Sequence, residues 1–256
     1  MSFKTLNKIV LAILLIAAML SALQLIPGLL IIGFILGYVS FLLFVSTNIQ
    51  LNFFVQAYNN NPYEEEDRIA LTFDDGPVEN TLKILEVLDK YKVKASFFCI
   101  GNNIEEHPEI FNLILKKGHF VGNHTYTHTR KMGFLSVETL VEEIRRCDQV
   151  MKETGGITPT TFRPPFGIIN PRTQKALDIT GHKVIGWNLR SYDAIIESEE
   201  IVVRRVLNRI KPGDVILFHD SKERTVEILE QLLIFLKANN FDPVRVDDLF
   251  QIDAYN

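Results

Sequence analysis

The chain contains a long tract without any charged side chain. Of its 256 residues, 9–63 include no Lys, Arg, Asp or Glu. Two apolar runs within the tract, 9–26 and 29–45, are separated by Pro27 and Gly28. At about 1.5 Å per residue in a helix, each run is about long enough to cross a hydrocarbon core of about 30 Å. We therefore expect an integral membrane protein that begins with a transmembrane helical hairpin in the lipid bilayer.

A signal peptide is the alternative interpretation of this tract, but its apolar core would be only about 7 to 15 residues long. Lys4 and Lys8 favour a cytoplasmic amino terminus, because positive charge is enriched on that side of the membrane. Two crossings would return the rest of the chain to the cytoplasm, whereas a single crossing would place it outside. The sequence leaves the side of the following domain open.

We expect three parts in the chain. These are a membrane tract at 1–58, an acidic linker at 59–67 and a folded domain at 68–256. The net charge of −4 does not suggest a nucleic-acid partner, and no feature indicates an obligate protein partner. Cys99 and Cys147 lack metal-site spacing, so we expect two small buried side chains rather than a disulfide.

Short apolar runs alternate with helical patterns from residue 69 onward. We expect strands at 69–73, 95–100, 119–122, 160–163, 183–188, 214–218 and 243–246. The intervening helices have clear end signals, such as Ser136 before one helix, and Asn170 and Gly181 around another. Strands separated by helices predict an α/β fold with a parallel sheet, whose functional edge lies at the carboxyl ends of the strands. Whether this sheet closes cannot be read from the periodicity.

Polar residues follow several of these strands. Asp74 and Asp75 end the first strand at a turn formed by Gly76 and Pro77, and two carboxylates converge only where a strand breaks. The residues that follow the later strands are the pair His124 and His128, Arg163 in a Pro-Pro turn, Trp187 with Asp193, and His219. We expect the two histidines on one face of a helical turn, where both imidazoles can reach one metal ion. Each signal is weak alone, but all five lie in the same layer of the predicted sheet.

Four stretches resemble, in this order, motifs of the polysaccharide deacetylase family. This family shares the chitooligosaccharide deacetylase homology domain and is also called carbohydrate esterase family 4. The stretches are Thr72-Phe73-Asp74-Asp75-Gly76-Pro77, His124-Thr125-Tyr126-Thr127-His128, Arg163-Pro164-Pro165-Phe166-Gly167 and Leu217-Phe218-His219. The resemblance implies a distorted (β/α) barrel of about seven parallel strands and a metal-dependent hydrolase that removes N-acetyl groups from an amino-sugar glycan.

The resemblance also implies a metal site. Asp75, His124 and His128 would hold a divalent metal, usually zinc in this family. Two imidazoles and one carboxylate leave positions open for water and for the acetyl oxygen. The same ligands also suit iron, cobalt or nickel.

The remaining roles follow from the same resemblance. Asp74 would be the general base, and Arg163 would keep it ionised. His219 would protonate the departing amine, with Asp193 as its carboxylate partner. The substrate and the oxyanion would be contacted by Phe166, through its backbone N–H, together with Trp187, Leu217 and Arg190.

One motif departs from the family. Where the family commonly has Trp-x-Val-Asp-x-x-Asp-Trp, this chain has Arg190 at the first acid and Ala194 at the final aromatic, while Asp193 matches the second acid. We hypothesise that Arg190 favours an anionic glycan or a lipid-linked sugar phosphate. Alternatively, Arg190 pairs with Asp193 or faces solvent.

Two other functions remain open on the sequence alone. The same site would serve an O-acetyl esterase acting on a xylan-like polymer, since an ester releases an alcohol and demands less of His219. A catalytically silent glycan-binding membrane protein is the alternative outside enzymes. That alternative predicts a substitution of the general base or of a metal ligand. The matched motifs show no such substitution, since Asp74, Asp75, His124 and His128 are all present.

Overall fold

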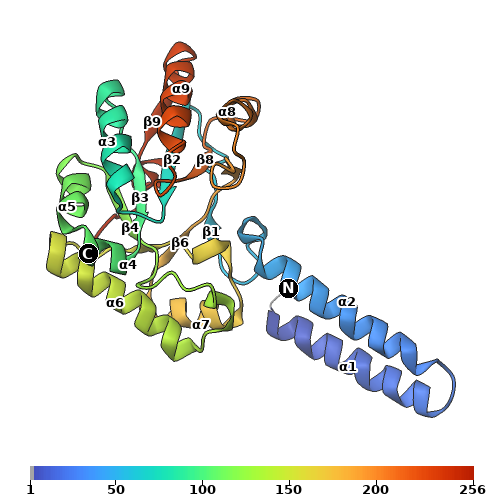
Figure 1. Ribbon diagram of the computed structural model, residues 1–256. Helices are drawn as coiled ribbons and strands as arrows, with labels where there is room; N and C mark the ends of the chain where they lie inside the picture. The colour runs from blue at the N-terminus through green and yellow to red at the C-terminus, as the bar shows by residue number, and fades with distance from the viewer. Residues whose placement is uncertain (1–2) are drawn as a thin grey trace.

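A computed structural model describes residues 3–256, and two apolar helices project from its folded part (Figure 1). Helices α1 (Phe3–Ala22) and α2 (Gly28–Ser46) lie antiparallel, and both are long and apolar enough to cross a membrane by length and composition. Most of their large apolar side chains are exposed, including Leu15 at 64% and Leu29 at 75%. The two predicted apolar runs thus form the two arms of a helical hairpin.

The remaining chain is built on one parallel sheet. Its strands, in chain order, are β1 (Ala57–Tyr58), β2 (Arg68–Asp74), β3 (Ser96–Cys99), β4 (Phe120–Asn123), β5 (Thr161–Phe162), β6 (Lys183–Ile185), β7 (Leu189–Arg190), β8 (Val215–His219) and β9 (Asp242–Val244). The spatial order is β1-β6-β5-β4-β3-β2-β8-β7, with β9 beside β2, and every ladder between these strands is parallel. The predicted α/β fold with a parallel sheet is therefore confirmed. β1 and β7 were not predicted. β1 lies in the tract assigned to the membrane part, and β7 follows the predicted strand at 183–188, of which only 183–185 form β6.

A single segment joins the two sides of this curled sheet. β6 pairs with β5, whereas β7, four residues further on, pairs with β8. Residues 183–190 thus begin beside one part of the sheet and end beside the other, which gives the distorted barrel. This closure brings the carboxyl ends of β2, β4, β5 and β8 around one centre.

Helices cover the outside of the sheet. They are α3 (Glu79–Tyr91), α4 (Gly101–Glu106), α5 (Pro108–Lys116), α6 (Val137–Gly155), α7 (Pro171–Thr180), α8 (Glu199–Leu207), α9 (Thr225–Ala238) and α10 (Val246–Phe250), with short 3-10 turns at η1 (Ile49–Leu51), η2 (Met132–Phe134) and η3 (Pro165–Gly167). The predicted caps are confirmed: the Ser136 side chain accepts a hydrogen bond from Thr139 N, and Gly181 ends α7 with a left-handed backbone. Val246, expected at the end of the last strand, instead begins α10.

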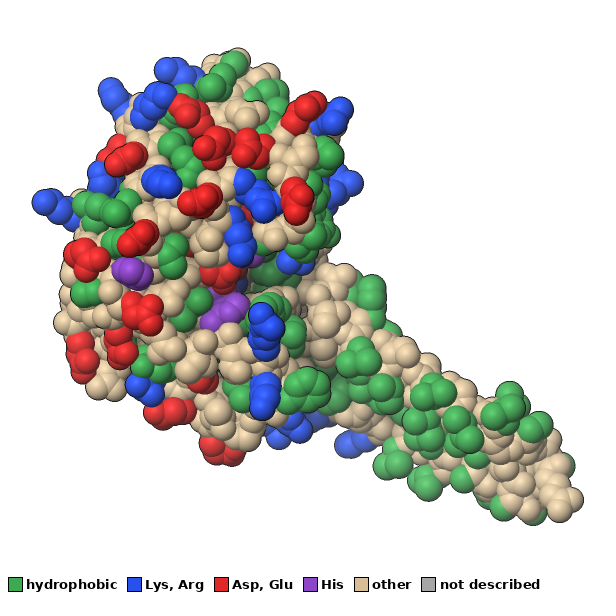
Figure 2. Space-filling model, in the orientation of Figure 1, with side chains coloured by type: hydrophobic (Ala, Val, Ile, Leu, Met, Phe, Trp, Pro, Cys, Tyr) green, Lys and Arg blue, Asp and Glu red, His purple; other side chains and the backbone are tan. Residues whose placement is uncertain are grey.

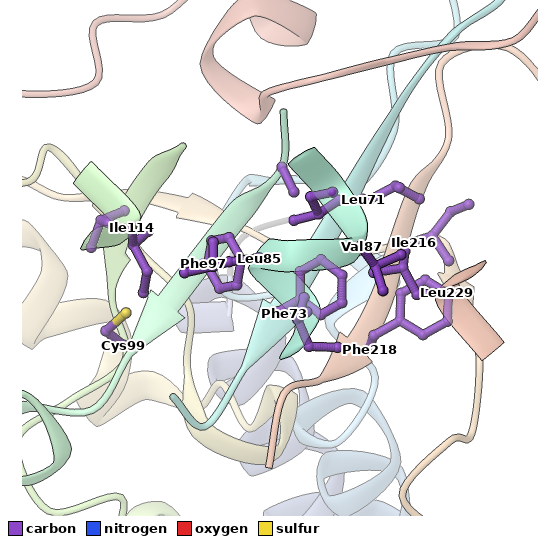
Figure 3. Close-up of a cluster of buried hydrophobic side chains, with 14 of the residues drawn as sticks. Leu71, Phe73, Leu85, Val87, Phe97, Cys99, Ile114, Ile216, Phe218 and Leu229 are labelled. Atoms are coloured by element: carbon purple, nitrogen blue, oxygen red, sulfur yellow. The ribbon is translucent and has the colours of Figure 1, made fainter. Parts of the chain in front are cut away.

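Both faces of the sheet are buried, as expected for parallel strands covered by helices. Leu71 and Phe73 of β2 pack with the α3 and α9 side chains in one cluster, shown in Figure 3, whereas Ala70 of the same strand belongs to a second cluster. This alternation follows from the two-residue period of a strand. Cys99 and Cys147 are buried and free, which confirms that they form no disulfide.

The segment between α2 and β2 packs on the sheet. Ile49 and Phe54 belong to the second buried cluster, and β1 pairs with β6. Within the predicted linker, the Asn61 backbone N–H donates to Gly213 O at 2.8 Å and its side chain donates to Leu249 O at 3.2 Å. Ile49 and Phe54, at the end of the charge-free tract, are therefore buried in the core of the folded domain. Asn61, in the segment 59–67, is held to that domain by hydrogen bonds.

Candidate active site

The polar residues that follow the strands meet in one cavity at the carboxyl edge of the sheet. Its volume is about 390 Å³, and it opens on the face shown in Figure 2. The lining residues are Asp74, Asp75, His124, His128, Arg130, Phe166, Trp187, Arg190, Ala194, Leu217, His219 and Lys222. Arg163 and Asp193 lie behind this lining, fully buried. The structure thus brings together every residue that the sequence predicts for the site.

The break after β2 separates the two adjacent carboxylates. Asp74 is the last residue of the strand, and Asp75 follows with a left-handed backbone of φ 79°. Gly76 is required next, because a Cβ there would lie 2.1 Å from Oδ2 of Asp220. This turn sends both carboxylates toward the cavity, which a continuing strand would not do.

Asp75, His124 and His128 form a compact group of ligand atoms. These atoms all lie within 4.8 Å of one another, and His128 Nε2 is 3.4 Å and His124 Nε2 3.7 Å from Asp75 Oδ1. His124 Nδ1 lies 2.7 Å from the carbonyl oxygen of Arg163, which can only accept, so Nδ1 carries the proton and Nε2 offers its lone pair. Burial lowers the pKa of His124, so this imidazole is neutral. One carboxylate and two imidazoles are a donor set that suits a divalent metal.

The loop that presents the two histidines is not a helical turn, so that expectation was wrong. Thr125 (φ 66°) and His128 (φ 50°) both have left-handed backbones, which interrupt any helix. Asn123 fixes the loop: its Oδ1 accepts from Thr125 N at 2.8 Å, and its Nδ2 donates to Ile144 O at 2.8 Å and to Asp148 Oδ1 at 2.7 Å. Sequence reasoning missed this supporting residue, whose only signal was its place directly before His124.

Arg163 joins three strands behind Asp74. Its Nη1 donates to Asp74 Oδ1 and to Thr72 Oγ1, both at 2.8 Å, while Nη2 and Nε donate to the carbonyls of Gly186 (2.8 Å) and Ile185 (3.1 Å). Its guanidinium also lies 4.0 Å from the ring centre of Phe98. The Arg163 guanidinium therefore holds Oδ1 of Asp74 by a hydrogen bond. The other oxygen of Asp74, Oδ2, is left available to the cavity and lies 3.8 Å from His124 Nε2.

Asp193 holds His219 at two points. Its Oδ2 accepts from the backbone N–H of His219 at 2.7 Å, and its Oδ1 lies 2.9 Å from the ring Nδ1. Thr225 and Ser191 donate to the same carboxylate at 2.7 and 2.9 Å. Burial lowers the pKa of His219, but the hydrogen bond and the charge of Asp193 outweigh burial, so that the pKa lies above its usual value. Asp193 therefore favours the imidazolium and leaves Nε2 as the free nitrogen.

The two departures from the family motif, Arg190 and Ala194, line the same cavity. Arg190 lines the cavity, and its Nε is buried without a hydrogen-bond partner among the described residues. It does not pair with Asp193, whose oxygens are bonded as described above, so that alternative is wrong. Arg130 and Lys222 also line the cavity, and sequence reasoning missed both. Their only signal was proximity along the chain to His128 and His219.

Comparison with known proteins agrees with this geometry. The family described as "Polysaccharide deacetylase" matches residues 61–185. The peptidoglycan-N-acetylglucosamine deacetylase of Bacillus cereus is 32% identical over 197 residues, which cover 75% of this chain and 71% of that protein. The enzyme named PgdA in Listeria monocytogenes is also 32% identical, over 184 residues and 72% of this chain, but this chain spans only 39% of its length.

A solved structure shows the same fold. A crystal structure of a peptidoglycan N-acetylglucosamine deacetylase superposes with a TM-score of 0.73 at 30% identity, covering 77% of this chain and 94% of that one. The motifs, the parallel sheet and these similarities lead to one conclusion. The chain belongs to the polysaccharide deacetylase family.

Proposed function

We propose that this protein is a membrane-anchored, metal-dependent hydrolase that removes N-acetyl groups from an amino sugar in a glycan. One observation supports this most strongly: two acid–base groups, Asp74 and His219, line the same cavity as the Asp75, His124 and His128 group. The relatives named as peptidoglycan deacetylases support the same chemistry. In this proposal α1 and α2 are the anchor, and the folded domain extends from about residue 47 to residue 256.

Asp75, His124 and His128 would hold the metal, and zinc is our first choice from the donor set. Iron, cobalt and nickel accept the same ligands. A divalent ion at this position would lower the pKa of a water molecule and polarise the acetyl carbonyl. The Arg163 carbonyl orients the His124 ring for this task through Nδ1, as carbonyl partners of metal-binding histidines commonly do.

Asp74 would act as the general base. Arg163 engages Oδ1, so Oδ2 is the oxygen that would accept a proton from the attacking water. As the water oxygen bonds to the acetyl carbon, negative charge develops on the carbonyl oxygen. We propose the backbone N–H of Phe166 as one donor to that oxygen, with Trp187 and Leu217 as walls for the substrate.

His219 would act as the general acid. The bond from Asp193 to Nδ1 leaves Nε2 to donate a proton to the sugar nitrogen as the C–N bond breaks. The raised pKa keeps the imidazole protonated before this step. The products are acetate and a free amine, and the proton that Asp74 accepted returns to solvent or to His219.

Two substitutions separate the roles of the adjacent carboxylates. We expect Asp75→Ala to lose bound metal, whereas Asp74→Asn should keep the metal and lower acetate release by about 10²- to 10⁴-fold, the usual contribution of a general base. Metal content after dialysis and acetate release from an N-acetylated chitooligosaccharide and from peptidoglycan are the measurements. Full turnover by Asp74→Asn would contradict the mechanism.

Controls guard this comparison against misfolding. Glu86 is an exposed carboxylate on α3, so Glu86→Gln should change neither metal content nor turnover. Asp75→Asn tolerates the left-handed backbone at this position better than alanine, because Asn commonly adopts it. A folded Asp75→Asn variant with weakened metal binding would show that metal loss in Asp75→Ala is a local effect.

A further inference from the structure

Three cationic side chains line the cavity without a role in the proposed chemistry. We call Arg130, Arg190 and Lys222 the cationic rim. Within residues 3–256 none of the three forms an ion pair. The only carboxylates in the lining are Asp74, which is paired with Arg163, and Asp75 in the metal group. The rim therefore presents uncompensated positive charge in a chain whose net charge is −4.

Arg190 is held in place by its neighbours. Its guanidinium lies 5.0 Å from the centre of the Tyr192 ring, and Arg205 lies 4.4 Å from the same ring. Arg205 Nε also donates to the carbonyl of Arg190 at 3.1 Å. Arg190 lines the cavity, and its Nε has no hydrogen-bond partner among the described residues. The planar guanidinium group matches phosphate oxygens, which accept two parallel hydrogen bonds.

The end of α2 is fixed to the loops that form the cavity. Ser46, its last residue, accepts a hydrogen bond from Ile169 N at 2.9 Å, and Ile169 follows the loop that contains Phe166. Gln50 donates to the carbonyl of Asn188 at 3.3 Å, next to Trp187 in the cavity wall. If α2 crosses the membrane, the cavity therefore opens close to the membrane surface.

Apolar side chains are exposed at the same opening. Phe166 lines the cavity and is 48% exposed, and Ile195, next to the lining residue Ala194, is 63% exposed. Hydrophobic and cationic side chains gather beside the central histidine in Figure 2. A lipid joined to a phosphate would match both the apolar and the cationic side chains at this opening.

We propose that the substrate is an acetylated amino sugar linked through phosphate to a membrane lipid; this inference rests on the proposed deacetylation. The cationic rim binds the phosphate, the exposed Phe166 and Ile195 contact the start of the lipid chain, and the acetamide lies between Asp74 and His219. Hydrolysis breaks the amide C–N bond, forms acetate with the oxygen of water and leaves the lipid-linked sugar with a free amine. Ala194, in place of a bulky aromatic, leaves room on the side of the rim.

The test compares three acetylated substrates with the full-length, metal-loaded protein. These are a neutral chitooligosaccharide, the same oligosaccharide with a phosphate at its reducing end, and the same phosphorylated oligosaccharide linked through that phosphate to a polyisoprenyl chain in liposomes. We expect kcat/KM from acetate release to rise by about tenfold with the phosphate and to rise further with the lipid, consistent with hydrogen bonds between charged groups. Equal kcat/KM for all three substrates would overturn the proposal, and a gain from phosphate without a gain from lipid would overturn its lipid part.

Variants of the rim separate charge recognition from a general loss of activity. Arg190→Gln and Lys222→Gln should each lower the ratio of kcat/KM for phosphorylated over neutral substrate by about tenfold. An exposed lysine on α9 supplies the matched control, Lys237→Gln, which should leave the ratio unchanged. Equal losses on both substrates would overturn the role of the rim.

A binding measurement distinguishes failure of this inference from failure of the proposed function. Calorimetric titration of the Asp74→Asn variant with each of the three ligands should show the same order of affinity, with the lipid-linked phosphate bound most tightly. Absence of acetate release from every substrate would refute the deacetylase function. Equal affinity of the Asp74→Asn variant for all three ligands would refute the proposed substrate class, even if the protein deacetylates neutral sugars.

Discussion

His219 shows how one buried carboxylate sets the state of a neighbouring imidazole. Asp193 forms hydrogen bonds with both the backbone N–H and the ring of His219. The Thr225 and Ser191 hydroxyls also donate to this carboxylate and stabilise its negative charge. Although burial raises the pKa of Asp193, those hydrogen bonds and the charge of His219 lower it below its usual value. The pair therefore favours carboxylate and imidazolium together, which is the state that a general acid requires.

This coupling leads to an expected change in pH dependence. Activity should fall at high pH as His219 loses its proton. Because Asp193 raises the pKa of His219, Asp193→Asn should move this alkaline limb of kcat/KM to lower pH. The measurement is kcat/KM for acetate release against pH, with Glu86→Gln as the control. An alkaline limb at the same pH in both variants would show that His219 is not the titrating acid.

At the scale of elements, helix α7 positions the loop that contains Phe166. Asn170 caps this helix directly after the loop, and its Oδ1 accepts from Arg172 N at 2.9 Å and from Thr173 N at 3.1 Å. Its Nδ2 donates across to Gly133 O at 2.8 Å, in the segment that follows His128. The cap thus ties together two of the loops around the cavity.

Removing this cap should destabilise the protein. Loss of an N-cap side chain costs about 1 kcal/mol, and Asn170→Ala also leaves the Gly133 carbonyl without its partner, so we expect a decrease of roughly 1–2 kcal/mol in the free energy of unfolding. Thermal unfolding of the full chain in detergent is the measurement. Asn239→Ala is the control. The side chain of Asn239 donates to Phe235 O at the exposed end of α9, so its removal should change stability by less than about 0.5 kcal/mol. Equal effects of both variants would contradict the capping argument.

At the scale of the whole molecule, the hairpin decides where the domain lies. The ring centre of Phe3, at the start of α1, lies 5.2 Å from that of Phe54 in the folded domain, and the turn between the helices lies at the far end (Figure 1). On the proposal that both helices cross the membrane, the domain is on the same side as the amino terminus. Lys4 and Lys8 then favour the cytoplasmic side.

Cysteine labelling in intact cells tests this arrangement. Both native cysteines are buried, so a membrane-impermeant maleimide should report only introduced ones. We expect Gln24→Cys, in the exposed turn between α1 and α2, to be labelled in intact cells. Glu65→Cys, on the surface of the folded domain, should be labelled only after permeabilisation. Labelling of Glu65→Cys in intact cells would contradict this arrangement. If Gln24→Cys were then unlabelled, the hairpin would cross in the opposite orientation, and if both were labelled, only one helix would cross.

The sequence by itself determined most strands and helices of the folded domain and the motif residues that line its cavity. Caps such as Ser136 and Asn170, and the alternation of β2, are local patterns that act within one turn or one strand. Each motif also follows its own strand directly, so a parallel sheet was enough to predict that they meet at one edge. The assignment of base, acid and metal ligands stays a prediction.

Only the tertiary structure decided how these residues pair. Arg163 and Asp74 are 89 positions apart, and Asp193 and His219 are 26 apart, so their contacts depend on the register and curl of the sheet. The same curl, closed by residues 183–190, brings Arg130 and Lys222 into the cavity beside Arg190 and fixes the end of α2 next to its wall. Local periodicity contains no information on such distant contacts, because they arise when the whole sheet closes around its buried core.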